Sequence, residues 1–368
     1  MKSHNYKTLF VSSPKSWRGG EQQLYYLLSE FSNQNKKFAI ICPFNSPLYQ
    51  KCKHHNWEVY SFKKRGLLNT GIARSIIKIA KQNGFDLLHA NDSHAHSAVI
   101  WANKMGLKLP IVLSRRVDFP IKNTFFSLKK YNFKYIKAIV CISEFVKKIL
   151  EPSIKNKSII KVVHDGIDVE KFKFVEKNYG LKQKFAIPNN HLIIGMVAAY
   201  APHKDYYTFI NTAEKVLNVN NQLTFFAIGE GSERTEMEKI IKQKKLDNKI
   251  ILTGFIDNIP GVLKDLDIFV LSSKTEGLGT SILDAFASKV PVVATNAGGI
   301  PEMLIHQQTG LISNVGDDTE MANNILKLIQ NNPLKDNLTI NAFEKVKDFS
   351  FKKMALGNIE VFDNVMRF

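Results

Sequence analysis

Short apolar runs alternate with amphipathic stretches along the N-terminal half of the chain. The apolar runs predict strands at 7–13, 37–43, 57–62, 86–92, 110–116 and 138–143. Between them, apolar residues recur at three- and four-residue spacing, which predicts helices at 21–34, 70–84 and 97–106. Continuous apolar strands that alternate with helices are typical of an α/β protein with a parallel, doubly wound sheet.

The C-terminal half repeats this pattern. Its predicted strands lie at 192–199, 223–231, 249–255, 267–273 and 290–296. Residues 168–190 are charged and end in Pro-Asn-Asn, which predicts a hinge. A chain of 368 residues is long for one core and suits two domains. We therefore expect two Rossmann-like domains that face a cleft, at 1–170 and 191–348, with a linker at 171–190.

One segment directly after a predicted strand combines two carboxylates with glycines. It reads TEGLGTSILDAFA over 275–287, with Glu276 before the glycines and Asp284 in the helix that follows. Ligands of such sheets bind beyond the carboxyl ends of the strands, where the N-terminus of a helix favours anions. The segment predicts a phosphate-binding loop, and the alternative is surface charge on an amphipathic helix.

Composition and charge narrow the class of protein. Residues 1–170 hold 28 Lys and Arg against 11 Asp and Glu, so nearly all of the net charge of +18 lies there. Such asymmetry indicates a nucleic acid, an acidic lipid surface or a phosphorylated acceptor as partner, or merely a basic soluble surface. Apolar content of 44% argues against disorder, and the apolar runs are too short to span a bilayer. The N-terminus predicts a strand rather than a signal peptide.

The cysteines and histidines do not predict a metal site. Cys42, Cys52 and Cys141 are odd in number and lack metal or redox spacing, which favours reduced thiols in the cytoplasm. His94 and His96 form a His-x-His pattern, but a third ligand at suitable spacing is missing from the sequence. We expect these two side chains, and the nearby His89, to line a cleft or to be structural.

The segment TEGLGTSILDAFASKVPVVATNAGGIPEML, at 275–304, resembles the signature of retaining, nucleotide-sugar-dependent glycosyltransferases of family 4, which have the GT-B fold. Other segments resemble family motifs in the family's order, at 17–23, 162–172, 195–206, 227–238 and 254–273. The resemblance implies two Rossmann-like domains, a C-terminal helix at 349–368 that returns to the N-terminal domain, and transfer without a metal or other cofactor. The leaving phosphate itself would accept the proton from the acceptor.

The resemblance also implies roles in binding a nucleoside diphosphate sugar. Glu276 would contact the sugar hydroxyls, Lys204 would neutralise the diphosphate, and Asp284 would hold the ribose where relatives usually have glutamate. Further donor-binding positions come from the glycine loop, the base-binding turn and the start of the helix. They are Gly19, Gly20, Glu230, Gly231, Gly277, Leu278, Gly279, Thr280 and Ser281. Where relatives often carry an arginine this chain has Ala199, so either one cation suffices or another basic residue, such as Arg18 or Lys274, supplies a second one.

The acceptor side departs from the family pattern. Many relatives place a histidine at the end of the strand that here reads IVLSRR, whereas this chain has Arg115, Arg116 and Asp118 near that position. We assign Arg116 and Asp118 to the catalytic set and expect the arginines to meet an anionic acceptor, because guanidinium pairs well with phosphate and carboxylate. The predicted acceptor-binding residues are Arg18, Glu21, His94 and Arg115.

Residues 122–137 interleave aromatic residues with lysines, among them Lys129, Lys130 and Lys134. A basic helix with aromatic residues suits an anionic membrane surface, and the same pattern fits a nucleic-acid face or a helix that buries its aromatic side chains. We expect a cytoplasmic glycosyltransferase on the inner face of the cell membrane. It would use a UDP- or GDP-sugar and a cell-envelope glycan or lipid-linked acceptor, such as lipopolysaccharide or capsule, and would not bind nucleic acid. The alternatives are a GT-B sugar-nucleotide epimerase and a non-catalytic nucleic-acid-binding protein.

Overall fold

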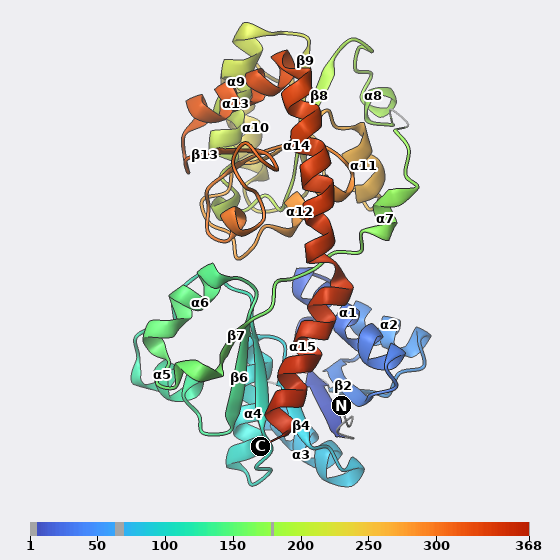
Figure 1. The fold of residues 1–368 in the computed structure, drawn as a ribbon, viewed down its shortest axis with the longest axis vertical. Coiled ribbons are helices and arrows are strands. Elements are labelled where there is room, and N and C mark those ends of the chain that lie inside the picture. The colour runs from blue at the N-terminus through green and yellow to red at the C-terminus, as the bar shows by residue number, and fades with distance from the viewer. Residues whose placement is uncertain (1–5, 63–69, 178–179, 368) are drawn as a thin grey trace. The chain divides into compact units, whose positions relative to one another are not determined.

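A computed structural model describes residues 6–62, 70–177 and 180–367. The chain forms two compact units (Figure 1). Unit 1 comprises Met1–Gly166 and Phe351–Phe368, and unit 2 comprises Ile167–Ser350. Each unit is a parallel sheet covered by helices, so the predicted α/β class with two Rossmann-like halves is confirmed.

The sheet of unit 1 has the strand order β3-β2-β1-β4-β5-β6-β7, and every pairing is parallel. Its strands are β1 (Lys7–Val11), β2 (Lys37–Pro43), β3 (Val59–Phe62), β4 (Leu87–Ala90), β5 (Ile111–Arg115), β6 (Ile136–Cys141) and β7 (Ile160–Val162). The chain order reverses between β1 and β4, so the segments that follow these two strands lie side by side. This is the position at which open parallel sheets bind ligands.

Helices cover both faces of this sheet. They are α1 (Gly19–Asn33), α2 (Pro47–His54), α3 (Thr70–Asn83), α4 (Ser93–Lys104), α5 (Phe125–Tyr131), α6 (Glu144–Leu150) and α15 (Phe351–Met366). Figure 1 shows α15, in red at the end of the chain, beside the N-terminal elements, and it packs on α1. Its Phe362 joins Phe10 and Phe31 in a buried aromatic cluster. The last helix thus completes the core of unit 1.

The sheet of unit 2 has the order β10-β9-β8-β11-β12-β13, again with every pairing parallel. Its strands are β8 (Leu192–Val197), β9 (Leu223–Ile228), β10 (Ile250–Leu252), β11 (Ile268–Leu271), β12 (Val292–Thr295) and β13 (Leu311–Ser313). Its helices are α7 (Glu170–Lys173), α8 (Gly180–Lys184), α9 (Tyr206–Val219), α10 (Arg234–Gln243), α11 (Ile259–Asp265), α12 (Thr280–Ala287), α13 (Asp318–Gln330) and α14 (Asn332–Lys345). Here the order reverses between β8 and β11.

The structure differs from the sequence prediction in several places. The three-residue strands β7 (IKV) and β13 (LIS) lie outside the predicted strands, because neither is a continuous apolar run, unlike β10 (IIL). The segment expected to be a linker, 171–190, contains part of α7 and all of α8. These helices belong to unit 2, where the backbone N–H of Leu181 donates to Asp265 at 2.8 Å.

Candidate active site

The first candidate site lies in unit 2, beyond the carboxyl ends of β8 and β11. The one-turn 3₁₀ helix η3 (Pro202–Lys204) follows β8, and the loop with Glu276 follows β11. Because β8 and β11 are neighbours in a parallel sheet, both segments emerge at the same edge. The reversal of strand order therefore brings together two residues that are 72 positions apart in the sequence.

Lys204 and Glu276 form an ion pair. The Nζ atom of Lys204 lies 2.5 Å from Oε1 of Glu276, and the two side chains are 16% and 10% exposed. The Ser273 hydroxyl donates to the same carboxylate oxygen at 2.7 Å. The Ser272 hydroxyl lies within hydrogen-bonding distance of the carbonyl oxygens of Lys204 and Asp205, at 3.1 and 2.9 Å. The two serines, which sequence reasoning missed, thus fix the positions of both charged residues.

The turn with Gly298 and Gly299 packs against the backbone of Glu276. The N–H of Gly299 donates to the carbonyl oxygen of Glu276 at 3.0 Å. A Cβ atom on Gly298 would lie 2.0 Å from that oxygen, and one on Gly299 would lie 2.4 Å from the carbonyl oxygen of Gly277. Since both distances are far below van der Waals contact, the two backbones can pack this closely only because neither residue has a side chain.

The helix α12 begins beside this pair. Its first residue is Thr280, followed by Ser281, and its cap residue Gly279 has a φ of +90° and supplies no side-chain cap. Leu278 is buried and anchors the loop. The N–H of Ile282 donates to the carbonyl oxygen of Gly279 at 3.0 Å, whereas the N–H groups of Thr280 and Ser281 precede this bond and can meet an anion, together with the positive end of the helix dipole. The predicted positions from Glu276 to Ser281 thus lie in one loop and the first turn of one helix.

Asp284 lies one turn further along α12. Burial raises the pKa of its carboxyl to about 7, and the nearby Lys171 of α7 acts in the opposite direction. A carboxyl that ionises near neutrality can accept hydrogen bonds from hydroxyls when it is charged. Asp284 lies, as predicted, in the helix that follows the Glu276 loop, and its contact with ribose stays a prediction.

The remaining predicted donor residues lie in adjoining loops. Arg234 pairs with Glu230 at 2.5 Å, and a Cβ atom on Gly231 would lie 2.3 Å from the carbonyl oxygen of Tyr200. The turn with Glu230 and Gly231 therefore packs against the loop that leads to Lys204. Ala199 is exposed on this loop, and Lys274 pairs with Asp205 at 3.4 Å.

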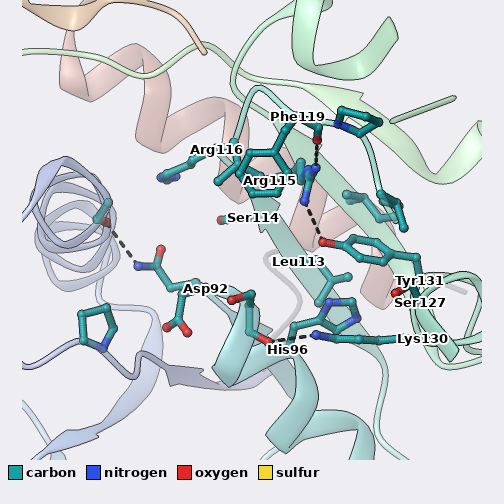
Figure 2. Close-up of a pocket in the computed structure, with 18 of the residues that line it drawn as sticks. Asp92, His96, Leu113, Ser114, Arg115, Arg116, Phe119, Ser127, Lys130 and Tyr131 are labelled. Carbon is teal, nitrogen blue, oxygen red and sulfur yellow. Dashed lines mark hydrogen bonds between the residues drawn. The ribbon is translucent and has the colours of Figure 1, made fainter. Parts of the chain in front are cut away.

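The second candidate site is a cavity of about 460 Å³ in unit 1, beyond the ends of β4 and β5 (Figure 2). Five residues predicted for donor or acceptor binding or catalysis line it, namely Arg18, Gly20, Glu21, Arg115 and Arg116. Gly19 and Gly20 form the first turn of α1 rather than a free loop. Among the described residues the lining does not include Gly19, His94 or Asp118, and the side chain of His94 is exposed. His96, two residues further along α4, lines the cavity instead.

Arg115 and Arg116 point in different directions (Figure 2). Arg115 donates to the Tyr131 hydroxyl at 2.9 Å and to the carbonyl oxygen of Phe119, so it fastens α5 and the preceding loop to the sheet. Arg116 extends toward α1, where its Cδ atom would lie 3.8 Å from a Cβ atom on Gly20. Its Nη2 atom lies 3.5 Å from Asp165, a carboxyl whose pKa burial raises.

Burial shifts the pKa values of several cavity residues. It lowers the pKa of His96 well below its usual value and that of Lys130 to about 8, and it raises that of Glu21, which lies near Asp92. Lys130 donates to the carbonyl oxygen of Ser93 at 2.9 Å. His89 lies in the core, where its Nε2 atom is 2.9 Å from the Ser114 hydroxyl and burial lowers its pKa to about 3. His89 is therefore structural.

Two aromatic side chains at the start of α5 face solvent, whereas Tyr131 at its end lines the cavity. Phe125 and Phe126 are 70% and 83% exposed, and Phe119 before the helix is 59% exposed. The interpretation in which this helix buries its aromatic residues is therefore wrong for these positions. Within the described ranges the structure has no cluster of three metal-binding side chains, and none of the helices described there is both long and apolar enough to cross a membrane.

Comparison with known proteins agrees with this architecture. Residues 17–171 match a family described as Glycosyltransferase Family 4, and residues 180–345 match Glycosyl transferases group 1. Two similar proteins are N-acetyl-alpha-D-glucosaminyl L-malate synthase of Bacillus anthracis and UDP-Gal:alpha-D-GlcNAc-diphosphoundecaprenol alpha-1,3-galactosyltransferase of Escherichia coli. The first is 24% identical over 80% of this chain and 79% of its own length. The second is 23% identical over 74% and 75%.

Among solved structures, Alr3699/HepE of Anabaena in complex with UDP and glucose has the same fold. The TM-score is 0.85 at 18% identity, and the alignment covers 97% of this chain and 99% of that one. The two family matches together span most of the chain, one in each unit. The chain is therefore an enzyme that belongs to the family 4 glycosyltransferases with the GT-B fold.

Proposed function

We propose that this enzyme transfers a sugar from a UDP- or GDP-sugar to a cell-envelope glycan or lipid-linked acceptor, with retention at the anomeric carbon. The observation that carries the proposal is the Lys204–Glu276 pair beside the uncapped first turn of α12. A cation and the first two amides of α12 at one sheet edge form a site for a diphosphate.

The geometry also suggests how the donor would be used. A diphosphate against α12 would attract the ammonium group of Lys204 and release Glu276 to accept hydrogen bonds from sugar hydroxyls. As the bond between sugar and phosphate breaks, negative charge grows on the leaving diphosphate, and Lys204 with the helix amides stabilises that charge. The leaving phosphate would then accept the proton from the acceptor hydroxyl on the same face of the sugar.

The similar proteins support this choice of substrates. The Anabaena structure contains UDP and glucose, and the Escherichia coli protein is named for a UDP-sugar donor and a diphosphoundecaprenol acceptor. The name of the Bacillus anthracis protein contains L-malate, a dicarboxylate. Both names thus include a negatively charged group, a diphosphate in one and a dicarboxylate in the other.

The test is release of UDP or GDP from a panel of nucleotide sugars with candidate glycan and lipid-linked acceptors. Lys204→Gln and Glu276→Gln should each abolish turnover. Lys215→Gln, which removes an exposed lysine paired with Asp318 in the same unit, should leave it unchanged. NMR of the product anomer tests retention. Interconversion of the nucleotide sugar without acceptor would identify an epimerase instead, and no release with no nucleotide binding would reject the proposal.

We also propose that unit 1 docks on the inner face of the cell membrane through the surface formed by Phe119, Phe125, Phe126, Lys122 and Lys129. All five side chains are exposed. Aromatic rings insert at the boundary between headgroups and acyl chains, and each lysine near anionic lipid adds about 1 kcal/mol of attraction.

Vesicle sedimentation tests this docking surface. Binding should require anionic phosphatidylglycerol and should fall when Phe125 and Phe126 are both changed to Ser. Phe174→Ser removes an equally exposed ring, 85% exposed, from unit 2 and serves as the control. Equal loss in both variants, or binding to nucleic acid in place of vesicles, would reject this surface as the membrane contact.

A further inference from the structure

The cavity of unit 1 collects buried polar atoms that have no hydrogen-bond partner. Among the described residues, nine buried side-chain nitrogen or oxygen atoms are unpartnered, and five of them belong to residues that line this one cavity. They are Asn91 Oδ1, His96 Nε2, Arg115 Nε, Arg116 Nε and Arg116 Nη1. Because an unpaired buried polar group costs free energy, such a concentration indicates an occupant that pairs with them.

The charge of the lining indicates an anion. Five cationic side chains line the cavity, from Arg18, Arg115, Arg116, Lys122 and Lys130, against the carboxyl groups of Glu21 and Asp92. The Asp92 carboxylate already accepts hydrogen bonds from the backbone and side chain of Ser13 and from the first amides of α4. The positive charge is therefore in excess at the place where the unpartnered N–H groups lie.

Arg115 and Arg116 differ in how many of their guanidinium nitrogens already have partners. Arg115 is committed to Tyr131 and Phe119, so it holds the wall of the cavity in place. Arg116 has two unpartnered guanidinium nitrogens and a single ion-pair contact at 3.5 Å. A planar guanidinium with two free N–H groups matches the oxygens of a phosphate or carboxylate.

From this arrangement we infer that the cavity binds a phosphate or carboxylate group carried by the acceptor, with Arg116 as its charged ligand. The inference rests on the proposed function and specifies the acceptor of that reaction. His96 Nε2, in the tautomer that carries a proton there, donates to the same group or to its neighbour. Asn91 Oδ1 accepts from a hydroxyl beside the anion. The apolar side chains of Leu113, Val117 and Ile121 line the remaining wall and suit an alkyl chain.

Calorimetric titration of the 368-residue chain tests anion binding to the cavity without any turnover. The probes are inorganic phosphate, octyl phosphate below its micelle concentration and L-malate, with octyl glucoside as the neutral probe of equal chain length. At least one anion should bind more tightly than octyl glucoside. Tighter binding of octyl phosphate than of inorganic phosphate identifies a lipid-linked phosphate, and tighter binding of L-malate identifies a free dicarboxylate.

Substitutions locate the site. Arg116→Gln should raise the dissociation constant about tenfold or more, equivalent to about 1.4 kcal/mol. Arg74→Gln makes the same change at an exposed arginine on α3, outside the cavity, and should have no effect. His96→Leu removes Nε2 but keeps an apolar contact with Tyr131, and it should weaken binding about threefold. Unfolding temperatures without ligand show whether each variant is folded.

The outcomes separate this inference from the proposed function. A protein that binds UDP but none of the anions, or whose folded Arg116→Gln and His96→Leu variants bind them as the wild type does, overturns the inference alone. Anion binding that is sensitive to Arg116, in a protein that binds no nucleotide or nucleotide sugar, supports an anion site and overturns the proposed donor instead.

Discussion

Replacing Gly298 with Ala tests whether the glycine turn fixes the position of Glu276. The new Cβ atom would lie 2.0 Å from the carbonyl oxygen of Glu276, whereas carbon and oxygen rarely approach closer than about 3.3 Å. The obstacle is backbone and not the flexible end of a side chain, so the Glu276 loop or the turn itself must move. Either movement disturbs the loop that holds the carboxylate next to Lys204.

Two effects set the magnitude. Gly298 has a φ of +57°, and an L-residue in the left-handed region costs about 1–2 kcal/mol. Forcing an extra carbon into a packed site typically costs a further 1–3 kcal/mol or so. Gly298→Ala should therefore lower the free energy of unfolding by about 2–5 kcal/mol.

Gly316→Ala provides a matched control. Gly316 also lies in unit 2 and has a φ of +79°, but a Cβ atom there would meet nothing within 4 Å. This variant carries the conformational cost without the steric one, so it should lower stability by only about 1–2 kcal/mol. The gain from a stiffer unfolded chain is the same for both substitutions and cancels in the comparison.

Urea unfolding of both variants, followed by circular dichroism, measures the difference. We expect Gly298→Ala to be the less stable by about 1–3 kcal/mol. Folded Gly298→Ala protein should also bind UDP more weakly than the wild type, whereas Gly316→Ala should bind UDP as the wild type does. Equal destabilisation by the two substitutions would show that the Glu276 backbone does not depend on close packing against Gly298.

Three further predictions follow from the contacts and pKa shifts. Lys204→Met should destabilise unit 2 by about 2–4 kcal/mol, because Glu276 loses its cation. Thermal unfolding of the double variant with Glu276→Gln should recover much of the lost stability, and no recovery would contradict a direct coupling between the two side chains. Asp284 is protonated more readily in the folded state, near pH 7, than in the unfolded state, near pH 3.9, so its ionisation lowers stability as pH rises through this window. Because Asp284 is partly exposed, Asp284→Asn should stabilise the protein by about 2 kcal/mol at pH 8, and it should leave the free energy of unfolding nearly unchanged at pH 4. A gain in stability that does not depend on pH would refute ionisation of Asp284 as its cause. Burial raises the pKa of Cys42, Cys52 and Cys141 to about 12, so a thiol reagent at pH 8 should modify them only after unfolding, and rapid labelling of the native protein would contradict their burial.

Sequence patterns predicted the fold well because a buried parallel strand is a continuous apolar run. Each strand longer than three residues falls within or overlaps a predicted one. The loop from Glu276 to Ser281 could also be predicted, since its residues are contiguous and its glycines follow a strand. The supporting contacts could not be predicted, because they depend on how the loops after β11 and β12 fold. The Ser273 hydroxyl bonds the Glu276 side chain, and Gly298, 22 residues later in the sequence, packs against the Glu276 backbone.

The acceptor side shows where such prediction ends. A period of two along an extended strand places consecutive residues on opposite sides, so the sequence Arg115-Arg116 implies that the two side chains diverge. It does not say which of them finds partners. The outcome depends on Tyr131, 16 residues after Arg115, whose hydroxyl accepts a hydrogen bond from Arg115. Arg116 has no such partner for its Nε and Nη1 atoms. The same applies to His94 and His96, because only the start of α4 at Ser93 decides which of the two faces the cavity. The identity of the charged ligand is thus a property of side-chain pairing between distant segments, and Arg116 is the residue at which the acceptor prediction is most directly tested.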